Sequence, residues 1–193
     1  MESKQKQLYI LKEAGADVNN SDATKGVVYK DKKKKYRVDG QGRDCFEIYA
    51  RGLNITLGDR PVYWQWKTDS NNNGIERAEL VKTRWLEVKG SFWTTGYLTH
   101  GSWYSVSFLV RLPAWSNMKK RMVNLRLTRP DGSIQEGQAE LPDEVGTEKW
   151  HELEVGRFHM SERNAGEMLF AMEQSFDRWR KGLFIKSVEI KAI

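Results

Sequence analysis

The chain has 193 residues, a formal net charge of +6 and a single cysteine. This length is enough for one domain with a sizeable core, and one cysteine excludes a framework of intrachain disulfides. No run of 18 apolar residues occurs, and the first residues lack the apolar segment of a signal peptide. The sequence therefore predicts a soluble, unsecreted protein without a membrane span, in a reducing compartment.

Residues 1–45 differ in composition from the rest of the chain. They are rich in Lys, Asp, Asn and Gly and hold 11 Lys/Arg against 7 Asp/Glu, so most of the net charge lies there. This composition predicts a short basic N-terminal extension with one or two helical turns over 9–14 and a turn at 40–42. The folded domain is predicted to cover residues 46–193.

A lysine run, Lys32-Lys33-Lys34-Lys35, is the most basic part of this extension. It has three interpretations: a solvated loop, a nuclear import signal, or an electrostatic contact for nucleic acid or an anionic membrane. A solvated loop is favoured, and import is the best functional alternative. No basic motif with interleaved aromatic residues accompanies the run, so its support for specific RNA binding is weak.

Cys45 stands at the junction between the extension and the domain. A half-buried, inert thiol is the favoured interpretation. The alternative is an intermolecular disulfide to a second chain, because a position at such a junction suits accessibility.

From Phe46 onward the dominant period is two residues, which is typical of half-buried strands. In residues 103–112 the even positions from 104 onward are apolar, whereas odd positions hold Ser105, Ser107 and Arg111. This strand is expected to turn one face inward and the other outward.

Other segments repeat the strand pattern. Residues 123–127 and 134–139 flank a Pro-Asp-Gly turn and predict a hairpin. Further strands are expected over 150–155, 166–173 and 183–190, the last with a bulge near Lys186, where the apolar phase changes. Seven or more short strands with turns between them predict an all-β fold, an antiparallel β-sandwich.

Aromatic residues supply the main candidates for a binding site, since the chain has 8 tryptophans. A sugar presents an apolar C–H face and a rim of hydroxyls, so its site needs an aromatic plate beside hydrogen-bonding groups such as carboxylates. The candidate plates are Trp64, Trp66 and Trp179, and the candidate acceptors are Glu167 and Glu173.

Three other tryptophans, Trp85, Trp103 and Trp150, stand at the heads of strand patterns and are predicted to lie in the core.

Catalysis has little support in the sequence. The three histidines are not spaced as metal ligands, and no Gly-x-Ser-x-Gly elbow occurs. On one strand, Glu167 and Glu173 would point to the same side about 20 Å apart, beyond the ~5–9.5 Å that glycoside hydrolysis needs. We therefore expect a binding protein without metal or cofactor.

Several motifs in collinear order over residues 46–193 resemble the phloem protein 2 and Nictaba-type plant lectins. The match includes Arg60-Pro61-Val62-Tyr63-Trp64-Gln65-Trp66, Trp85-Leu86-Glu87-Val88-Lys89-Gly90, Leu127-Thr128-Arg129-Pro130-Asp131-Gly132, Trp150-His151-Glu152-Leu153, Gly166-Glu167 and Trp179-Arg180-Lys181-Gly182-Leu183. Residues 1–45 resemble the basic extensions of the phloem members.

The resemblance implies a jelly-roll-like β-sandwich that binds N-acetylglucosamine oligomers (chitooligosaccharides) and N-glycan cores without catalysis or metal, usually as a homodimer. Members of the family are nucleocytoplasmic or abundant in phloem sap, which implies a cytoplasmic location in sieve elements and companion cells and allows a nuclear one. Phloem members are also associated with filament proteins and RNA transport. The alternative function is therefore an RNA- or protein-interaction module that uses the basic N-terminal segment.

By position, Trp64, Glu167 and Glu173 resemble the sugar site proposed for the family. The sequence departs from the family pattern at Leu57, where several members have a Trp of that sugar-binding surface. The loss of one stacking plate removes about 0.5–1.5 kcal/mol of aromatic contact, which predicts weaker affinity or an altered glycan preference.

Overall fold

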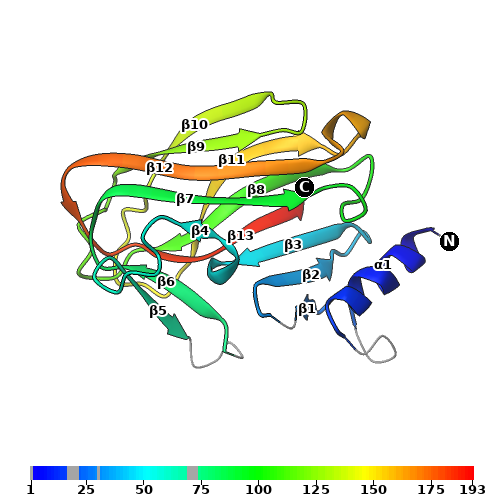
Figure 1. Cartoon of the computed structure of the whole chain (residues 1–193), viewed down its shortest axis with the longest axis horizontal. Helices are drawn as coiled ribbons and strands as arrows, with labels where there is room; N and C mark the ends of the chain where they lie inside the picture. Colours follow the sequence, from blue (N-terminus) through cyan, green and yellow to red (C-terminus); the bar gives the residue numbers. More distant parts are fainter. Residues whose placement is uncertain (1, 17–21, 30, 69–73) are drawn as a thin grey trace.

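Two antiparallel β-sheets face each other across a shared apolar core (Figure 1). The computed structural model describes residues 2–16, 22–29, 31–68 and 74–193. Each strand pair within these residues is antiparallel. The all-β sandwich predicted from the alternating pattern is confirmed.

The described residues form one eight-stranded and one five-stranded sheet. The eight-stranded sheet contains β1 (Val27–Val28), β2 (Lys34–Val38), β3 (Asp44–Tyr49), β5 (Trp64–Thr68), β6 (Glu76–Leu80), β8 (Trp103–Arg111), β11 (His151–His159) and β13 (Phe184–Ala192). The five-stranded sheet has the order β10 (Ile134–Glu140), β9 (Met122–Thr128), β12 (Glu167–Arg180), β7 (Thr83–Trp93) and β4 (Asn54–Ile55). The helical elements are α1 (Glu2–Glu13) and the short 3-10 helices η1 (Ala50–Gly52) and η2 (Glu162–Asn164).

The inner face of the five-stranded sheet supplies one side of the core. Met168, Phe170 and Met172 alternate along β12, and all three side chains are buried. Val123 and Leu127, at alternate positions of β9, are buried in the same way. Because successive side chains on a strand point to opposite faces, the residues between these positions lie on the outer face of the sheet.

Strand β8 follows the expected inward–outward alternation, but its outer face is covered. Ser105, Ser107 and Arg111 lie on the outward face, as predicted, yet all three are buried. β8 pairs with β11 on one side and β13 on the other, so each small serine lies between longer charged side chains. The Arg111 guanidinium is covered by the Trp150 ring, 4.8 Å away, and also packs against Phe184. Alternation therefore assigned these residues to the correct face, but it does not show whether that face is covered.

The N-terminal segment is built into the sandwich rather than extending from it. Helix α1 is longer than the predicted turns, and it packs Ile10 and Leu11 against Tyr36 and Val38 of β2. Strands β2 and β3 continue the eight-stranded sheet, with α1 beside them in Figure 1. The division expected between residues 45 and 46 therefore falls inside β3.

Two local predictions are confirmed. Strands β9 and β10 form the hairpin expected around the Pro-Asp-Gly turn, with Ile134 opposite Thr128. In β13 the register with β8 shifts between Ile185 and Ser187, which is the bulge expected near Lys186.

Candidate functional site

The outer face of the five-stranded sheet gathers alternate residues of its strands onto one surface, which we call the recessed face. Strand β7 contributes its odd-numbered residues because the side chains of Leu86, Val88 and Phe92 occupy the core. The recessed face comprises Trp85, Glu87, Lys89, Ser91 and Trp93 of β7, Glu167, Leu169, Ala171, Glu173 and Ser175 of β12, Asn124, Arg126 and Thr128 of β9, Ile134, Glu136 and Gln138 of β10, and Asn54 of β4.

Strand pairing arranges these side chains in rows. Glu167 pairs with Trp93 across β12 and β7, at one end of the recessed face. Glu173 pairs with Glu87 on one side and with Asn124 on the other. No register shift separates residues 167 and 175, so the two glutamates share a face, as their spacing predicted.

A hollow lies between these two acidic positions. It encloses about 620 Å³ and is lined by Asn54, Lys89, Ser91, Arg126, Thr128 and Leu169, among others. A second hollow of about 450 Å³ adjoins it, with Arg126 lining both. Ala171, whose strand neighbours are Lys89 and Arg126, keeps the middle of this surface low because its side chain is short.

Ion pairs fix the charged groups of the recessed face. Arg126 Nη2 lies 3.0 Å from Glu173 Oε1, and Lys89 Nζ lies 2.6 Å from Glu87 Oε1. The hydrogen bonds that Glu87 accepts from Lys89 and from the Thr56 hydroxyl hold the pKa of its carboxyl below the ordinary value. The face therefore presents ionised acceptors and cationic donors that are already oriented.

Trp93 supplies the aromatic surface that this arrangement needs. Its side chain is 59% exposed, and it stands directly across from Glu167. Trp85, 60% exposed, lies toward the opposite end of β7, beside Ser175. Such a face can stack a ring and hydrogen-bond to hydroxyl or amide groups beside it.

Exposure reverses the roles that were predicted for several tryptophans. Trp64 is only 3% exposed and belongs to the core, because it pairs with Leu80 of β6 and turns inward. It offers no free ring face for stacking. Trp85 and Trp103 were predicted to be buried, yet both are exposed, whereas Trp150 is half-buried over Arg111.

Trp66 also has a structural role. Its indole Nε1 donates a hydrogen bond of 2.9 Å to the carbonyl of Gly58, and the Arg51 guanidinium lies 3.7 Å above its ring. The side chain thus holds the loop that contains Leu57, whose φ of 61° and exposed side chain place it at the surface.

Trp179 lies at the far end of β12 from Glu167. It is 51% exposed and stacks on Tyr63, with ring centroids 6.5 Å apart and an interplanar angle of 14°. Lys82 Nζ lies 5.5 Å from the Trp179 ring. The structure therefore does not bring Trp64, Trp66 and Trp179 together with Glu167, although it does place Glu167 and Glu173 on one surface.

Cys45 and the lysine run differ in accessibility. Cys45 is 1% exposed, and its Sγ accepts a hydrogen bond of 3.5 Å from the amide of Ala192. Burial raises the pKa of its thiol, so a disulfide to a second chain would require this packing to open. By contrast, Lys32, Lys33 and Lys34 are exposed at the start of β2 and in the turn before it, and Lys35 is half-buried.

Two further properties concern the part of the chain that the structure describes. Its His, Cys, Asp and Glu side chains form no cluster of three or more that could hold a metal ion. No helix among the same residues is long and apolar enough to span a bilayer.

Fold and site together define a two-sheet β-sandwich protein with a recessed polar face and exposed aromatic rings at its ends. Residues 43–192 match the family model described as Phloem protein 2. The chain belongs to the phloem protein 2 family.

Named relatives are similar over most of the chain. The Arabidopsis thaliana protein Phloem protein 2-like A1 is 38% identical over 172 residues, which cover 86% of this chain and 69% of the relative. A protein from Luffa acutangula named lectin is 32% identical over 171 residues, which cover 87% of this chain and 80% of that protein. Among solved structures, a carbohydrate-binding module of Cellvibrio mixtus lichenase 5A is 14% identical, with a TM-score of 0.42 over 75% of this chain and 95% of the module. That structural similarity is too low to bear on function.

Proposed function

We propose that this protein is a non-catalytic lectin that binds N-acetylglucosamine oligomers and N-glycan cores on the recessed face. The observation that carries the proposal is the position of the exposed Trp93 directly across from Glu167, next along their strands to a hollow lined by Ser91 and Leu169. The name lectin of the Luffa acutangula relative supports a carbohydrate ligand.

The chemistry of the face suits an amino-sugar oligomer. One sugar ring stacks on Trp93, while Glu167 accepts hydrogen bonds from its hydroxyl or amide groups. Following units lie along the hollow, where Asn54 and Arg126 donate to hydroxyl and acetamido oxygens. Trp85, eight residues from Trp93 on β7, lies about 27 Å away and so serves a different unit of a longer glycan.

The same geometry supports binding without hydrolysis. Glu167 and Glu173 lie six residues apart on a strand of unbroken register, which separates them by about 20 Å. A glycosidase needs two carboxyl groups within ~9.5 Å of each other. Glu87 lies directly opposite Glu173, but both carboxylates are engaged in ion pairs, with Lys89 and Arg126 respectively. Membership of the phloem protein 2 family supports three further parts of this proposal. The protein forms a homodimer, it is located in the cytoplasm of phloem cells, and a phloem filament protein is one of its partners.

Titration with chitotriose tests the proposal. The wild type should show saturable binding by calorimetry and a change in tryptophan fluorescence, both nearly independent of salt. Trp93→Ala should weaken binding about tenfold, because it removes the stacking surface and its apolar contact.

Trp103→Ala is the matched control, since Trp103 is also 53% exposed but lies on β8 of the other sheet. Its affinity for chitotriose should equal that of the wild type. Absence of binding by the wild type, or equal affinity in Trp93→Ala, would contradict the proposed site.

Exposure of Lys32, Lys33 and Lys34 favours a second candidate function, an RNA- or protein-interaction surface on the N-terminal segment. Binding to RNA phosphates would fall steeply as salt rises, whereas binding to a neutral sugar would barely change. Replacing these three lysines with Gln should remove the salt-dependent binding to RNA and leave sugar binding unchanged. The location of the same variant in cells tests nuclear import.

A further inference from the structure

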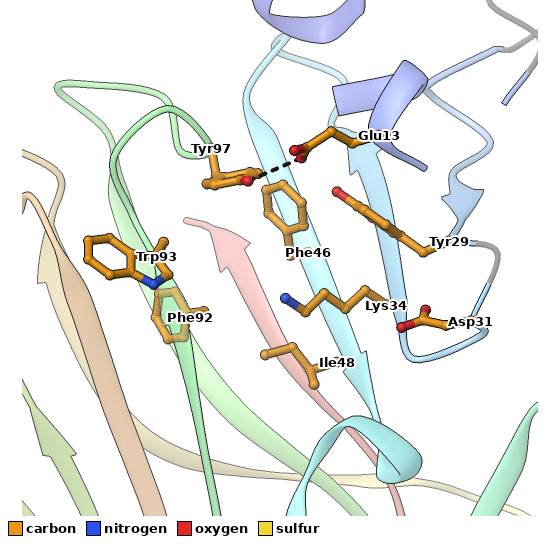
Figure 2. Close-up of a pocket in the computed structure, with 9 residues that line it drawn as sticks. All are labelled: Glu13, Tyr29, Asp31, Lys34, Phe46, Ile48, Phe92, Trp93 and Tyr97. Atoms are coloured by element: carbon orange, nitrogen blue, oxygen red, sulfur yellow. Dashed lines mark hydrogen bonds between the residues drawn. The ribbon is translucent and has the colours of Figure 1, made fainter. Parts of the chain in front are cut away.

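A cavity of about 220 Å³ lies where the N-terminal segment meets the sandwich (Figure 2). The N-terminal segment contributes Glu13, Tyr29, Asp31 and Lys34, and the remaining walls come from β3, β7 and the residues after β7. The first group lies outside residues 43–192, the part that matches the family. The cavity is therefore built partly from sequence that the family match does not cover.

The lining combines an apolar floor with aromatic walls. Ile48 and Phe92 are buried and form the floor with Phe46. Tyr29 and Tyr97 stand beside them, as Figure 2 shows. A compact ligand with a flat apolar body can bury its surface against such groups, and a cavity of this size accommodates one or two fused rings.

The two carboxylates at the cavity already accept hydrogen bonds. Glu13 accepts from the Tyr97 hydroxyl at 3.1 Å and from the Tyr9 hydroxyl at 2.8 Å. Asp31 Oδ1 accepts from the backbone amide of Lys33 at 3.1 Å. These acids are thus engaged in holding the N-terminal segment in place.

Lys34 has a different position. In Figure 2 its ammonium group extends from β2 across the cavity, toward Phe92 and Trp93. Within the described residues, Lys34 has neither an ion pair nor a side-chain hydrogen bond. Glu13 and Asp31 belong to the same lining, but neither pairs with Lys34, so its exposed ammonium group is free to form a charge-assisted hydrogen bond with an anionic ligand group.

We propose that this cavity binds a small aromatic carboxylate, with its ring on the floor formed by Phe46, Ile48 and Phe92 and its carboxylate on Lys34. Burial raises the pKa of Tyr29, so its hydroxyl stays protonated. This ligand class differs from the neutral glycan of the recessed face, and the proposal does not depend on that function.

The test uses 2-naphthoate and its neutral isostere 2-naphthamide, titrated into the full chain by calorimetry. Naphthoate should bind at one site, and naphthamide should bind about tenfold more weakly because it lacks the charge that pairs with Lys34. Lys34→Gln should weaken naphthoate binding about tenfold and leave naphthamide binding unchanged.

Two variants serve as controls. Lys33→Gln removes a neighbouring charge that does not line the cavity, and Lys89→Gln removes a cation of the adjacent hollow, which Lys34 also borders. Both should bind naphthoate as the wild type does. The proposal is overturned if the wild type does not bind naphthoate, if Lys34→Gln binds it equally well, or if Lys89→Gln loses as much affinity.

Competition separates this proposal from the glycan proposal. Trp93 lines this cavity as well as the recessed face, and Lys34 borders both hollows. Saturating chitotriose should still leave the affinity for naphthoate within a factor of two, because naphthoate is assigned to Lys34 and to the floor formed by Phe46, Ile48 and Phe92 rather than to the Trp93 ring. Complete displacement of naphthoate by chitotriose would mean that the cavity belongs to the glycan site, which would also overturn the inference.

Discussion

The outer faces of the two sheets are built from the same strand alternation but are covered differently. On the eight-stranded sheet, Arg111 lies beneath Trp150 and is 6% exposed. On the five-stranded sheet, the Arg126 side chain is 40% exposed beside an open hollow. The comparison shows that an outward-pointing charged residue is available to a ligand only where no neighbouring side chain covers it.

Replacement of these two arginines should produce the largest contrast. Arg111→Ala should lower the free energy of unfolding by about 2–3 kcal/mol, because it removes the packing with Trp150 and the charged hydrogen bond that Arg111 donates to Glu148. Arg126→Ala should cost less than about 1 kcal/mol, since its ion pair with Glu173 is screened by solvent. Urea denaturation followed by circular dichroism measures both, and equal losses would contradict the difference in coverage.

A double-mutant cycle sharpens the same contrast. The coupling free energy between Arg111 and Trp150 should be about 1–2 kcal/mol, because the cation–π contact is desolvated. The coupling between Arg126 and Glu173 should be about 0.2–1 kcal/mol, as is usual for exposed pairs. Unfolding free energies of the single and double variants give both values, and a larger coupling for the exposed pair would count against this view.

The smallest effects concern pH. Burial, together with Glu47, raises the pKa of Glu189 on the eight-stranded sheet, whereas Lys89 and Thr56 lower that of Glu87 on the recessed face. At a pH above the ordinary carboxyl pKa, a group whose pKa is raised by folding destabilises the folded state, and a group whose pKa is lowered by folding stabilises it.

Glu189→Gln should therefore raise the free energy of unfolding at pH 7, and this gain should vanish as the pH falls below the ordinary Glu pKa of about 4.3. Glu87→Gln should lower that free energy at pH 7, and its loss should vanish over the acidic range as wild-type Glu87 becomes protonated. Denaturation at pH 7 and pH 3 compares the variants with the wild type. If both substitutions changed the free energy of unfolding in the same direction at pH 7, the opposite pKa shifts assigned to Glu189 and Glu87 would be refuted.

Local patterns predicted much of the fold. Alternation predicted the strands, the Pro-Asp-Gly turn predicted the hairpin, and the change of apolar phase predicted the bulge at Lys186. These features depend on residues close together in the sequence, which is why they could be read without a tertiary structure. The helix over 2–13 was underestimated because its stability depends on Ile10 packing against β2.

The candidate site was predicted less completely. Spacing placed Glu167 and Glu173 on one face, but Trp64 was chosen as a stacking plate, whereas Trp93 is exposed beside Glu167. The alternation along β7 could have shown that Trp93 lies on the outer face, since the apolar residues Val88 and Phe92 occupy the opposite, inner face. The burial of Trp64 and the cavity beside Glu13 depend on contacts between distant segments, which the sequence pattern does not contain.

The position of β13 has a consequence for biosynthesis. This strand pairs with β3, β6 and β8, and Ser187 Oγ donates to Glu47 Oε1, a residue 140 positions earlier in the chain. During translation, β3 and β8 have no partner in the middle of their sheet until residues 184–192 leave the ribosome. Until then the nascent chain exposes unpaired strand edges, and chaperones that shield such edges should influence the yield of folded protein more than its final stability.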